Sequence, residues 1–136
     1  MLIQKRSADR ASAPSMLDCS ISEHVKAGES DLEAAMRGMK EEMGVEGIDL
    51  KPLVTIKMEY GPNDNEISRI YEGKVKPEQV QFDPVEISEI SYMSLDEIQA
   101  GISNEEGKYC GWFVEIMNWY FQKPTKLTVL GGASLL

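Results

Sequence analysis

The stretch "EHVKAGESDLEAAMRGMKEEMGV", residues 23–45, decides the fold of this chain. Within it apolar residues recur at helical spacing, which predicts a helix over residues 31–43. Ser30 is a suitable N-cap, and Gly44 is a natural helix terminator. The apolar stripe that we expect to face the core consists of Leu32, Ala35, Met36, Met39 and Met43.

The other side of this helix carries Arg37, Gly38, Glu41 and Glu42. A glycine in a helix interior costs about 1 kcal/mol relative to alanine, so Gly38 needs an explanation. An exposed face with one Arg37–Glu41 ion pair would contribute only about 0.2–0.5 kcal/mol. Adjacent carboxylates are also the hard oxygen ligands that Mg²⁺ or Mn²⁺ takes when it binds a phosphate. The residues alone leave both interpretations open.

The composition is that of one folded domain with a strongly acidic balance. The chain has 136 residues, of which 42% are hydrophobic and 27% charged, and its formal net charge is −9. That charge argues against a nucleic-acid polymer or an anionic membrane as the main partner. Cys19 and Cys110 are too few for a disulfide framework, so we expect reduced thiols in a cytoplasmic protein. The single histidine excludes a multi-histidine zinc site, no apolar run reaches membrane-spanning length, and the first residues do not read as a signal peptide.

The rest of the chain alternates between strand-like and helix-like segments. The patterns predict strands at residues 2–6, 16–22, 50–60, 66–75 and 85–93, and helices at residues 94–102 and 111–122. The turn-rich "GPNDN" at 61–65 makes the third and fourth of these strands a hairpin. A tail from about residue 123 to 136 contains one strand-like patch, "LTVL". This order predicts a single α/β domain over residues 1–136.

Residues 23–45 resemble the Nudix box, G-x5-E-x7-R-E-U-x-E-E-x-G-U, in which U is a bulky aliphatic residue. The positions that agree are Glu29, Arg37, Met39, Glu41, Glu42, Gly44 and Val45. Two positions depart from the box, since Glu23 stands where the family has glycine and Gly38 where it has glutamate. The resemblance implies the Nudix fold, a mixed sheet sandwiched between helices in an α/β/α arrangement. It also implies a metal-dependent attack on a diphosphate linkage, with Mg²⁺ (or Mn²⁺) on Glu41 and Glu42.

The same resemblance assigns further roles within the box. Glu42 is then also a catalytic residue, and Glu29 and Arg37 pair to support the loop against the helix. We expect the two departures to compensate, because a carboxylate at Glu23 would face the space left at Gly38 and serve as a metal ligand or as the base for the attacking water. The structural alternative is that Glu23 points to solvent and Gly38 only relieves a close contact.

Beyond the box, residues 1–30, 64–73, 86–98 and 111–113 resemble the Nudix branch that contains isopentenyl-diphosphate delta-isomerase. The resemblance implies that Arg6 and Arg10 hold the diphosphate and that Trp112 stacks on the substrate. It further implies metal-site and proton-transfer roles, which fall on His24, Asp64 and Glu66. This chain has Ser22 at the position of the isomerase's catalytic cysteine, and we include Ser22 in the expected metal site. Two further metal-binding histidines of the isomerase have no counterpart here. Each residue also has a structural reading: His24 as a partner of a loop carbonyl, Glu66 as an exposed strand residue and Trp112 as a core aromatic.

Three functions remain in competition at this point. The leading one is a Nudix pyrophosphohydrolase acting on a nucleoside or isoprenoid diphosphate derivative. The second is an isomerase, which needs two placed acid/base groups; a serine hydroxyl at Ser22 is a poor substitute for a thiol. The third is a non-catalytic Nudix domain that binds a nucleotide or diphosphate, which the missing glutamate at Gly38 favours. Glu86 and Glu89 are weaker candidates for a later catalytic glutamate.

The N-terminal strand raises a question of assembly. Nudix domains usually place another strand before it, and an unpaired strand edge is an aggregation liability. We therefore expect this edge to be covered by the "LTVL" tail or by a second subunit, which predicts a homodimer.

Overall fold

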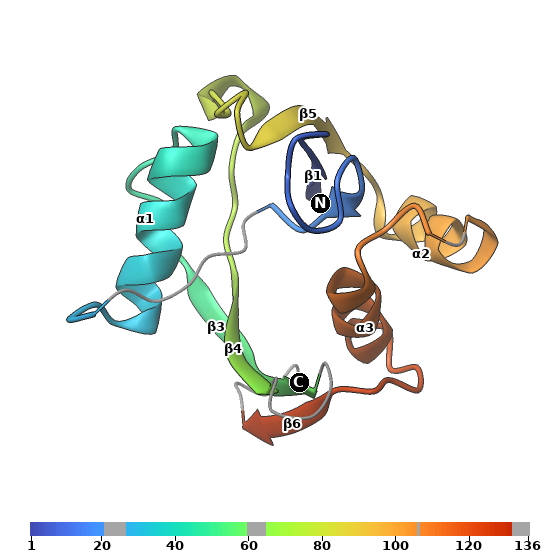
Figure 1. Ribbon diagram of the computed structural model, residues 1–136. Helices are drawn as coiled ribbons and strands as arrows, with labels where there is room; N and C mark the ends of the chain where they lie inside the picture. The colour runs from blue at the N-terminus through green and yellow to red at the C-terminus, as the bar shows by residue number, and fades with distance from the viewer. Residues whose placement is uncertain (21–26, 60–64, 106, 132–136) are drawn as a thin grey trace.

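The fold combines two small sheets with three helices (Figure 1). The computed structural model describes all residues except 21–26, 60–64, 106 and 132–136, and the side chains of residues 59, 65 and 66 are likewise not described. The elements are β1 (Leu2–Arg6), β2 (Leu17–Asp18), α1 (Asp31–Met43), β3 (Lys51–Glu59), β4 (Asn65–Glu72), the 3-10 turn η1 (Pro77–Gln79), β5 (Ile87–Tyr92), α2 (Leu95–Asn104), α3 (Gly111–Tyr120) and β6 (Thr128–Gly131). No helix in this described part is long and apolar enough to cross a membrane.

One sheet has the strand order β2-β1-β5 and the other β4-β3-β6. The ladders are antiparallel, and a parallel bridge joins Leu17 to Tyr109. β3 and β4 pair along almost their whole length, from the Lys51–Glu72 pair onward. This pairing confirms the predicted hairpin.

The first strand is covered, but the expectation that the "LTVL" tail covers it is wrong. β1 is the middle strand of its sheet: β5 pairs with it from Leu2 to Arg6, and the short β2 pairs with Gln4 and Lys5 on the other side. The "LTVL" segment pairs with β3 instead, through β6. The argument for a homodimer from an open β1 edge therefore fails, and the homodimer itself stays a prediction.

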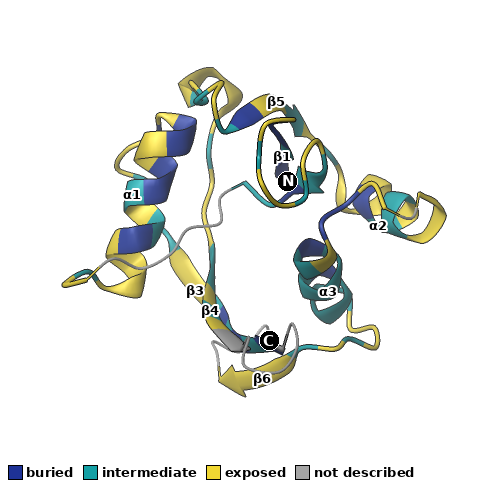
Figure 2. Cartoon of the chain, viewed as in Figure 1, coloured by how far each residue is buried: buried dark blue, intermediate teal, exposed yellow. Residues whose placement is uncertain are grey.

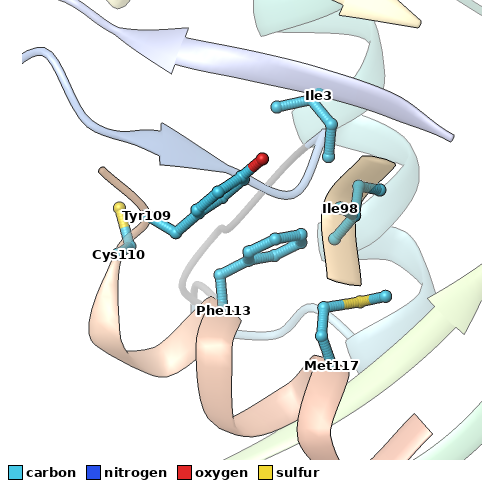
Figure 3. Packing of buried hydrophobic residues seen from close by; sticks show 6 residues of the cluster. All are labelled: Ile3, Ile98, Tyr109, Cys110, Phe113 and Met117. Carbon is cyan, nitrogen blue, oxygen red and sulfur yellow. The ribbon is translucent and has the colours of Figure 1, made fainter. Parts of the chain in front are cut away.

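The largest core cluster lies between one face of the β1 sheet and the two C-terminal helices. Figure 3 shows its buried residues, Ile3, Ile98, Tyr109, Cys110, Phe113 and Met117. The rings of Tyr109 and Phe113 stack with centroids 5.7 Å apart. α2 begins at a capping box, in which Ser94 and Glu97 each bond the other's backbone N–H. The predicted helices at 94–102 and 111–122 are therefore present, with the second ending at Tyr120.

α1 packs on the opposite face of the same sheet. Successive residues of a strand point to opposite faces, so Leu2 faces α1 while Ile3 faces the other helices. Met39 and Met43 of α1 contact this second cluster, which also includes Ile87 of β5. The β1 sheet thus lies between helices, and the α/β/α Nudix architecture is confirmed.

The face of α1 that is buried differs from the prediction. Leu32 and Met36 are each 41% exposed, so these two members of the apolar stripe lie at the surface. The buried residues are Ala34, Gly38, Met39, Glu42 and Met43. Figure 2 shows buried and exposed residues alternating around α1. The helix is therefore rotated, relative to the prediction, so that Gly38 and Glu42 turn inward.

The ends of α1 are as predicted. The Ser30 hydroxyl accepts a hydrogen bond from the Glu33 N–H at 3.1 Å, which satisfies one of the free donors of the first turn. Gly44 is left-handed, with φ 66°, and its N–H donates to Lys40. Two carbonyl groups of the last turn accept hydrogen bonds from outside the helix: Gln81 N–H donates to Met43 and Asp83 N–H to Glu42.

Candidate functional site

The loop before α1 is linked to the helix by a two-pronged ion pair. Arg37 Nε and Nη2 donate to the two carboxylate oxygens of Glu29 at 2.8 and 3.1 Å. The side chains are only 18% and 14% exposed, so water screens the pair weakly. Arg37 also donates to Glu41 at 3.2 Å, one helical turn away. The sequence placed Glu29 and Arg37 together, and the structure brings them into contact.

The two adjacent glutamates of α1 have different surroundings. Glu42 is 8% exposed and lies on the buried face of the helix. The side chain of Glu41 is 53% exposed and is paired with Arg37. One carboxylate is thus largely removed from water, where its charge interacts more strongly, while its neighbour remains accessible. Adjacent residues of a helix project in different directions, so the two carboxylates lie in different surroundings.

The other residues expected at the metal site are only partly placed. Ser22, Glu23, His24 and Asp64 lie outside the described residues. The backbone of Glu66 is described and pairs with Met58 close to the end of the β3–β4 hairpin. Among the side chains that the structure describes, no group of three or more His, Cys, Asp or Glu could hold a metal ion. The donor chemistry that is present, two adjacent carboxylates with one of them buried, fits Mg²⁺ or Mn²⁺.

Arg6 is a buried cation at the end of β1. Its side chain is 6% exposed and lies 3.4 Å from Asp18. Its Nε and Nη2 donate to the Ser12 carbonyl oxygen at 3.2 and 3.0 Å. Its guanidinium also lies over the Trp112 ring, 5.3 Å from the ring centroid, a cation–π distance.

Asp18 is a functional candidate that the sequence analysis missed. Its carboxylate accepts hydrogen bonds from the Cys19 N–H at 2.7 Å and from the Trp112 indole N–H at 2.9 Å, besides the contact with Arg6. The residue is fully buried, and burial raises the pKa of Asp18 while these donors act in the opposite direction. The available signal was one acidic residue inside an apolar strand-like segment, "MLDCSIS".

Arg10 is the more accessible of the two expected diphosphate-binding arginines. Its side chain is 26% exposed and pairs with Glu86 at 2.5 Å. Glu86, a weaker catalytic candidate, is thus a partner of this arginine, and it precedes β5 directly. Arg6 is the last residue of β1, and Arg10 lies in the loop of residues 7–16 that connects β1 to β2.

Neither cysteine offers a reactive thiolate. Burial raises the pKa of Cys110 to about 12. Burial, followed by the nearby Asp18 carboxylate, also raises the pKa of Cys19. Burial thus favours the protonated form of both thiols.

Comparison with known proteins agrees with this geometry. The model of the NUDIX domain family matches residues 1–113. An isopentenyl-diphosphate Delta-isomerase of Pectobacterium atrosepticum is 28% identical over 117 residues, which is 83% of this chain and 64% of that protein. An uncharacterized Nudix hydrolase of Clostridium acetobutylicum is 32% identical over 125 residues, 84% of this chain and 59% of that protein. The chain therefore spans about three fifths of the length of these curated relatives.

A solved structure has the same fold. The crystal structure of DR0079 from Deinococcus radiodurans superposes with a TM-score of 0.73 at 25% identity, covering 87% of this chain and 72% of that one. By its family match, its fold and the residues of its box, this chain belongs to the Nudix family.

Proposed function

We propose that this protein is a metal-dependent Nudix pyrophosphohydrolase of a small molecule that contains a diphosphate, a nucleoside or an isoprenoid derivative. The observation that carries the proposal is the pair of glutamates at the end of α1. Glu42 is buried and Glu41 exposed on a helix whose entry is held by the Glu29–Arg37 pair. Carboxylate oxygens are the ligands that Mg²⁺ or Mn²⁺ prefers, and the resemblance to the Nudix box makes these two glutamates the candidate ligands.

Mg²⁺ (or Mn²⁺) held by Glu41 and Glu42 would supply charge neutralisation of the diphosphate and a more acidic bound water. The further ligands proposed from the family resemblance are Ser22, His24, Asp64 and Glu66. The proton of the attacking water would pass to a carboxylate oxygen, for which Glu42, Glu23 and Glu66 are the candidates. Glu29 and Arg37 do not touch the ligand in this scheme; they fix the helix.

Binding of the diphosphate compound also needs cationic side chains and a surface against which the rest of the molecule can pack. Arg10, on the loop of residues 7–16, is accessible enough to donate to phosphate oxygens in a two-pronged manner. Arg6 is also proposed for this role, although its donors already bond Ser12 and contact Asp18. Trp112, half-buried beside Arg6, would form an aromatic wall of the site.

Isomerisation of an isoprenoid diphosphate is the second candidate, because one relative carries that name. Two observations rank it lower. The chain has serine at Ser22, and the described thiols have raised pKa values. The guanidinium of Arg6 lies over Trp112, so a positive charge developing on a substrate stacked there would meet a cation on the same ring.

The test is release of phosphate from a panel of nucleoside and isoprenoid diphosphate compounds with Mg²⁺ or Mn²⁺. We expect wild-type turnover and a loss of about a hundredfold or more in Glu42→Gln, the size usual for removing a group that stabilises the transition state. The matched control is Glu46→Gln, because Glu46 is an exposed glutamate just beyond the same helix. An unchanged rate in Glu42→Gln, with its fold intact by circular dichroism, would overturn the metal assignment. Binding without turnover by the wild type would indicate the non-catalytic alternative.

The cytoplasmic location and the homodimer remain predictions. Sedimentation at several protein concentrations would test the assembly state directly. A monomer at all concentrations would contradict the homodimer.

A further inference from the structure

The loop of residues 7–16 has an unusual backbone. Its base is closed by two hydrogen bonds, from the Arg6 N–H to Met16 at 2.9 Å and from the Ser15 N–H to Arg6 at 3.1 Å. Ala13 and Ser15 have φ values of 46° and 60°, in the left-handed region that residues with a side chain rarely adopt. Such residues persist only where their surroundings hold them, and they concentrate at ligand sites.

The group that holds this loop from inside is the Arg6 guanidinium. Two of its nitrogens donate to one carbonyl oxygen, that of Ser12, immediately before the left-handed Ala13. A third nitrogen faces Asp18. Because the side chain is 6% exposed, these contacts are made almost out of water, where they are strong.

Asp18 in turn fixes the guanidinium. One of its oxygens faces Arg6, and the other accepts from the Trp112 indole and from the Cys19 N–H. Asp18 belongs to β2, and Trp112 of α3 donates to its carboxylate. This carboxylate in turn contacts Arg6, whose guanidinium binds the loop. The chain of contacts runs from the buried Asp18 through the buried Arg6 to Ser12, an exposed residue of the loop.

The outer part of the loop presents Arg10. The Ser7 N–H donates to the Glu86 carbonyl at 3.0 Å, and Arg10 pairs with the Glu86 side chain. Arg10 is therefore held at one place on the surface but is not buried. Its ion pair with an exposed glutamate is weak enough for a more highly charged group to displace.

We infer that Asp18 is a positioning residue that acts through Arg6 on the loop of residues 7–16, so that Arg10 is preformed to receive the diphosphate of the ligand. The inference rests on the proposed function for its ligand, and it makes Arg6 the residue that orders the loop and Arg10 the direct contact. If the loop is already ordered, binding of the ligand does not have to offset the entropy cost of ordering the loop. Loss of the Asp18 carboxylate should therefore weaken binding of the diphosphate without changing the metal ligands.

The test uses Asp18→Asn, which leaves an oxygen for Trp112 but can place an amide N–H₂ against Arg6. Arg6→Lys is the second variant, because lysine keeps the charge and loses the fork of donors to Ser12. Asp96→Asn, at an exposed aspartate of α2, is the control for the change in charge. Hydrogen exchange of the backbone amides is measured over residues 7–16, and calorimetry gives the affinity for methylene diphosphonate with Mg²⁺ and for Mg²⁺ alone.

We expect both variants to exchange faster in the loop and to bind methylene diphosphonate about tenfold or more weakly, as is usual for the loss of an outer partner of a bound group. Their affinity for Mg²⁺ alone should stay within about twofold of the wild type, since the metal ligands on α1 are unchanged. The effects of the double variant should be less than additive, because both changes act on one guanidinium.

Three results would overturn the inference, and they are distinguishable. Unchanged exchange in the loop of Asp18→Asn would show that the residue does not order it. Faster exchange with unchanged diphosphonate affinity would show that the loop does not serve the ligand site. No binding of methylene diphosphonate by the wild type would defeat the proposed function and, with it, the role of Arg10.

Discussion

The ion pair that joins the loop before α1 to the helix allows a quantitative prediction. Replacing Arg37 with methionine keeps the length and much of the apolar stem but removes both donors to Glu29. Exposed ion pairs contribute about 0–1 kcal/mol, whereas breaking a buried pair costs about 3–5 kcal/mol. The Arg37–Glu29 pair is forked and its side chains are 18% and 14% exposed, so it lies between these limits. We expect Arg37→Met to lower the free energy of unfolding by about 2 kcal/mol.

This loss translates into a measurable shift. An unfolding entropy of about 2.1 cal/mol/K per residue gives about 0.29 kcal/mol/K for a chain of this length. A loss of about 2 kcal/mol therefore lowers Tm by about 7 °C. Thermal unfolding followed by circular dichroism would measure it, and urea unfolding would give the free energy independently.

Lys40→Met is the matched control on the same helix. Lys40 pairs with Glu46 at 3.0 Å, but those side chains are 67% and 66% exposed. We expect its removal to cost less than about 0.5 kcal/mol, because water screens the pair. If Arg37→Met and Lys40→Met destabilise the protein equally, the forked pair does not support the box, and the structural role of Arg37 must be abandoned.

The remaining predictions concern the helix end, a buried acid and the variant box position. Gly44 and Gly47 are both left-handed, but a Cβ at Gly44 would lie 2.7 Å from a backbone oxygen, whereas a Cβ at Gly47 would meet nothing within 4 Å. We therefore expect Gly47→Ala to lower the free energy of unfolding by about 1 kcal/mol and Gly44→Ala by at least about 1 kcal/mol more, as measured by thermal unfolding. Burial raises the pKa of Asp18, so the native protein holds that proton more tightly than the unfolded chain does. The free energy of unfolding should therefore fall as pH rises above about 4 through the folded pKa, and urea unfolding of Asp18→Asn should lack that fall. Gly38→Glu should destabilise the metal-free protein by about 2 kcal/mol or more, because it adds a carboxylate to the buried helix face that carries Glu42. Mg²⁺ should recover part of the lost Tm, and a Tm that does not respond to Mg²⁺ would count against a metal ion at this position.

The features that the sequence predicted well rest on local chemistry. The cap at Ser30, the left-handed Gly44 and the pairing of β3 with β4 each depend on residues a few positions apart. The contact of Glu29 with Arg37, which the resemblance to the box implied, is also present. Local geometry determines such features, so the order of the residues is enough to find them.

The features that failed depend on contacts distant in the sequence. Nothing near β1 indicates that β5 pairs with it, so the edge of the strand was expected to be covered by the "LTVL" tail or by a second subunit. Periodicity marks the apolar rows of α1, but the packing of Met39 and Met43 against the β1 sheet decides which row is buried, and Leu32 and Met36 are left exposed. Asp18 was missed for the same reason, because its partners Arg6 and Trp112 come from a different strand and from the last helix.

The rotation of α1 changes the meaning of Gly38. On the predicted helix this glycine shared one side with charged residues, and nothing there explained its cost in helix propensity. In the structure Ala34, Gly38 and Glu42 recur every four residues along a buried row, so Gly38 stands one turn before a buried carboxylate on the same face. A glutamate there would bring two like charges together out of water, and only a bound cation would make that arrangement favourable. Glycine removes one of these charges at the expense of helix propensity, which lowers the demand for metal on this face of the helix. Glu23 lies outside the described residues, so variants must decide whether it replaces the missing carboxylate. Three variants are compared: Glu23→Gly, Gly38→Glu and the double variant that carries both changes. Compensation requires that Glu23→Gly alone loses Mg²⁺ affinity and that the double variant recovers it.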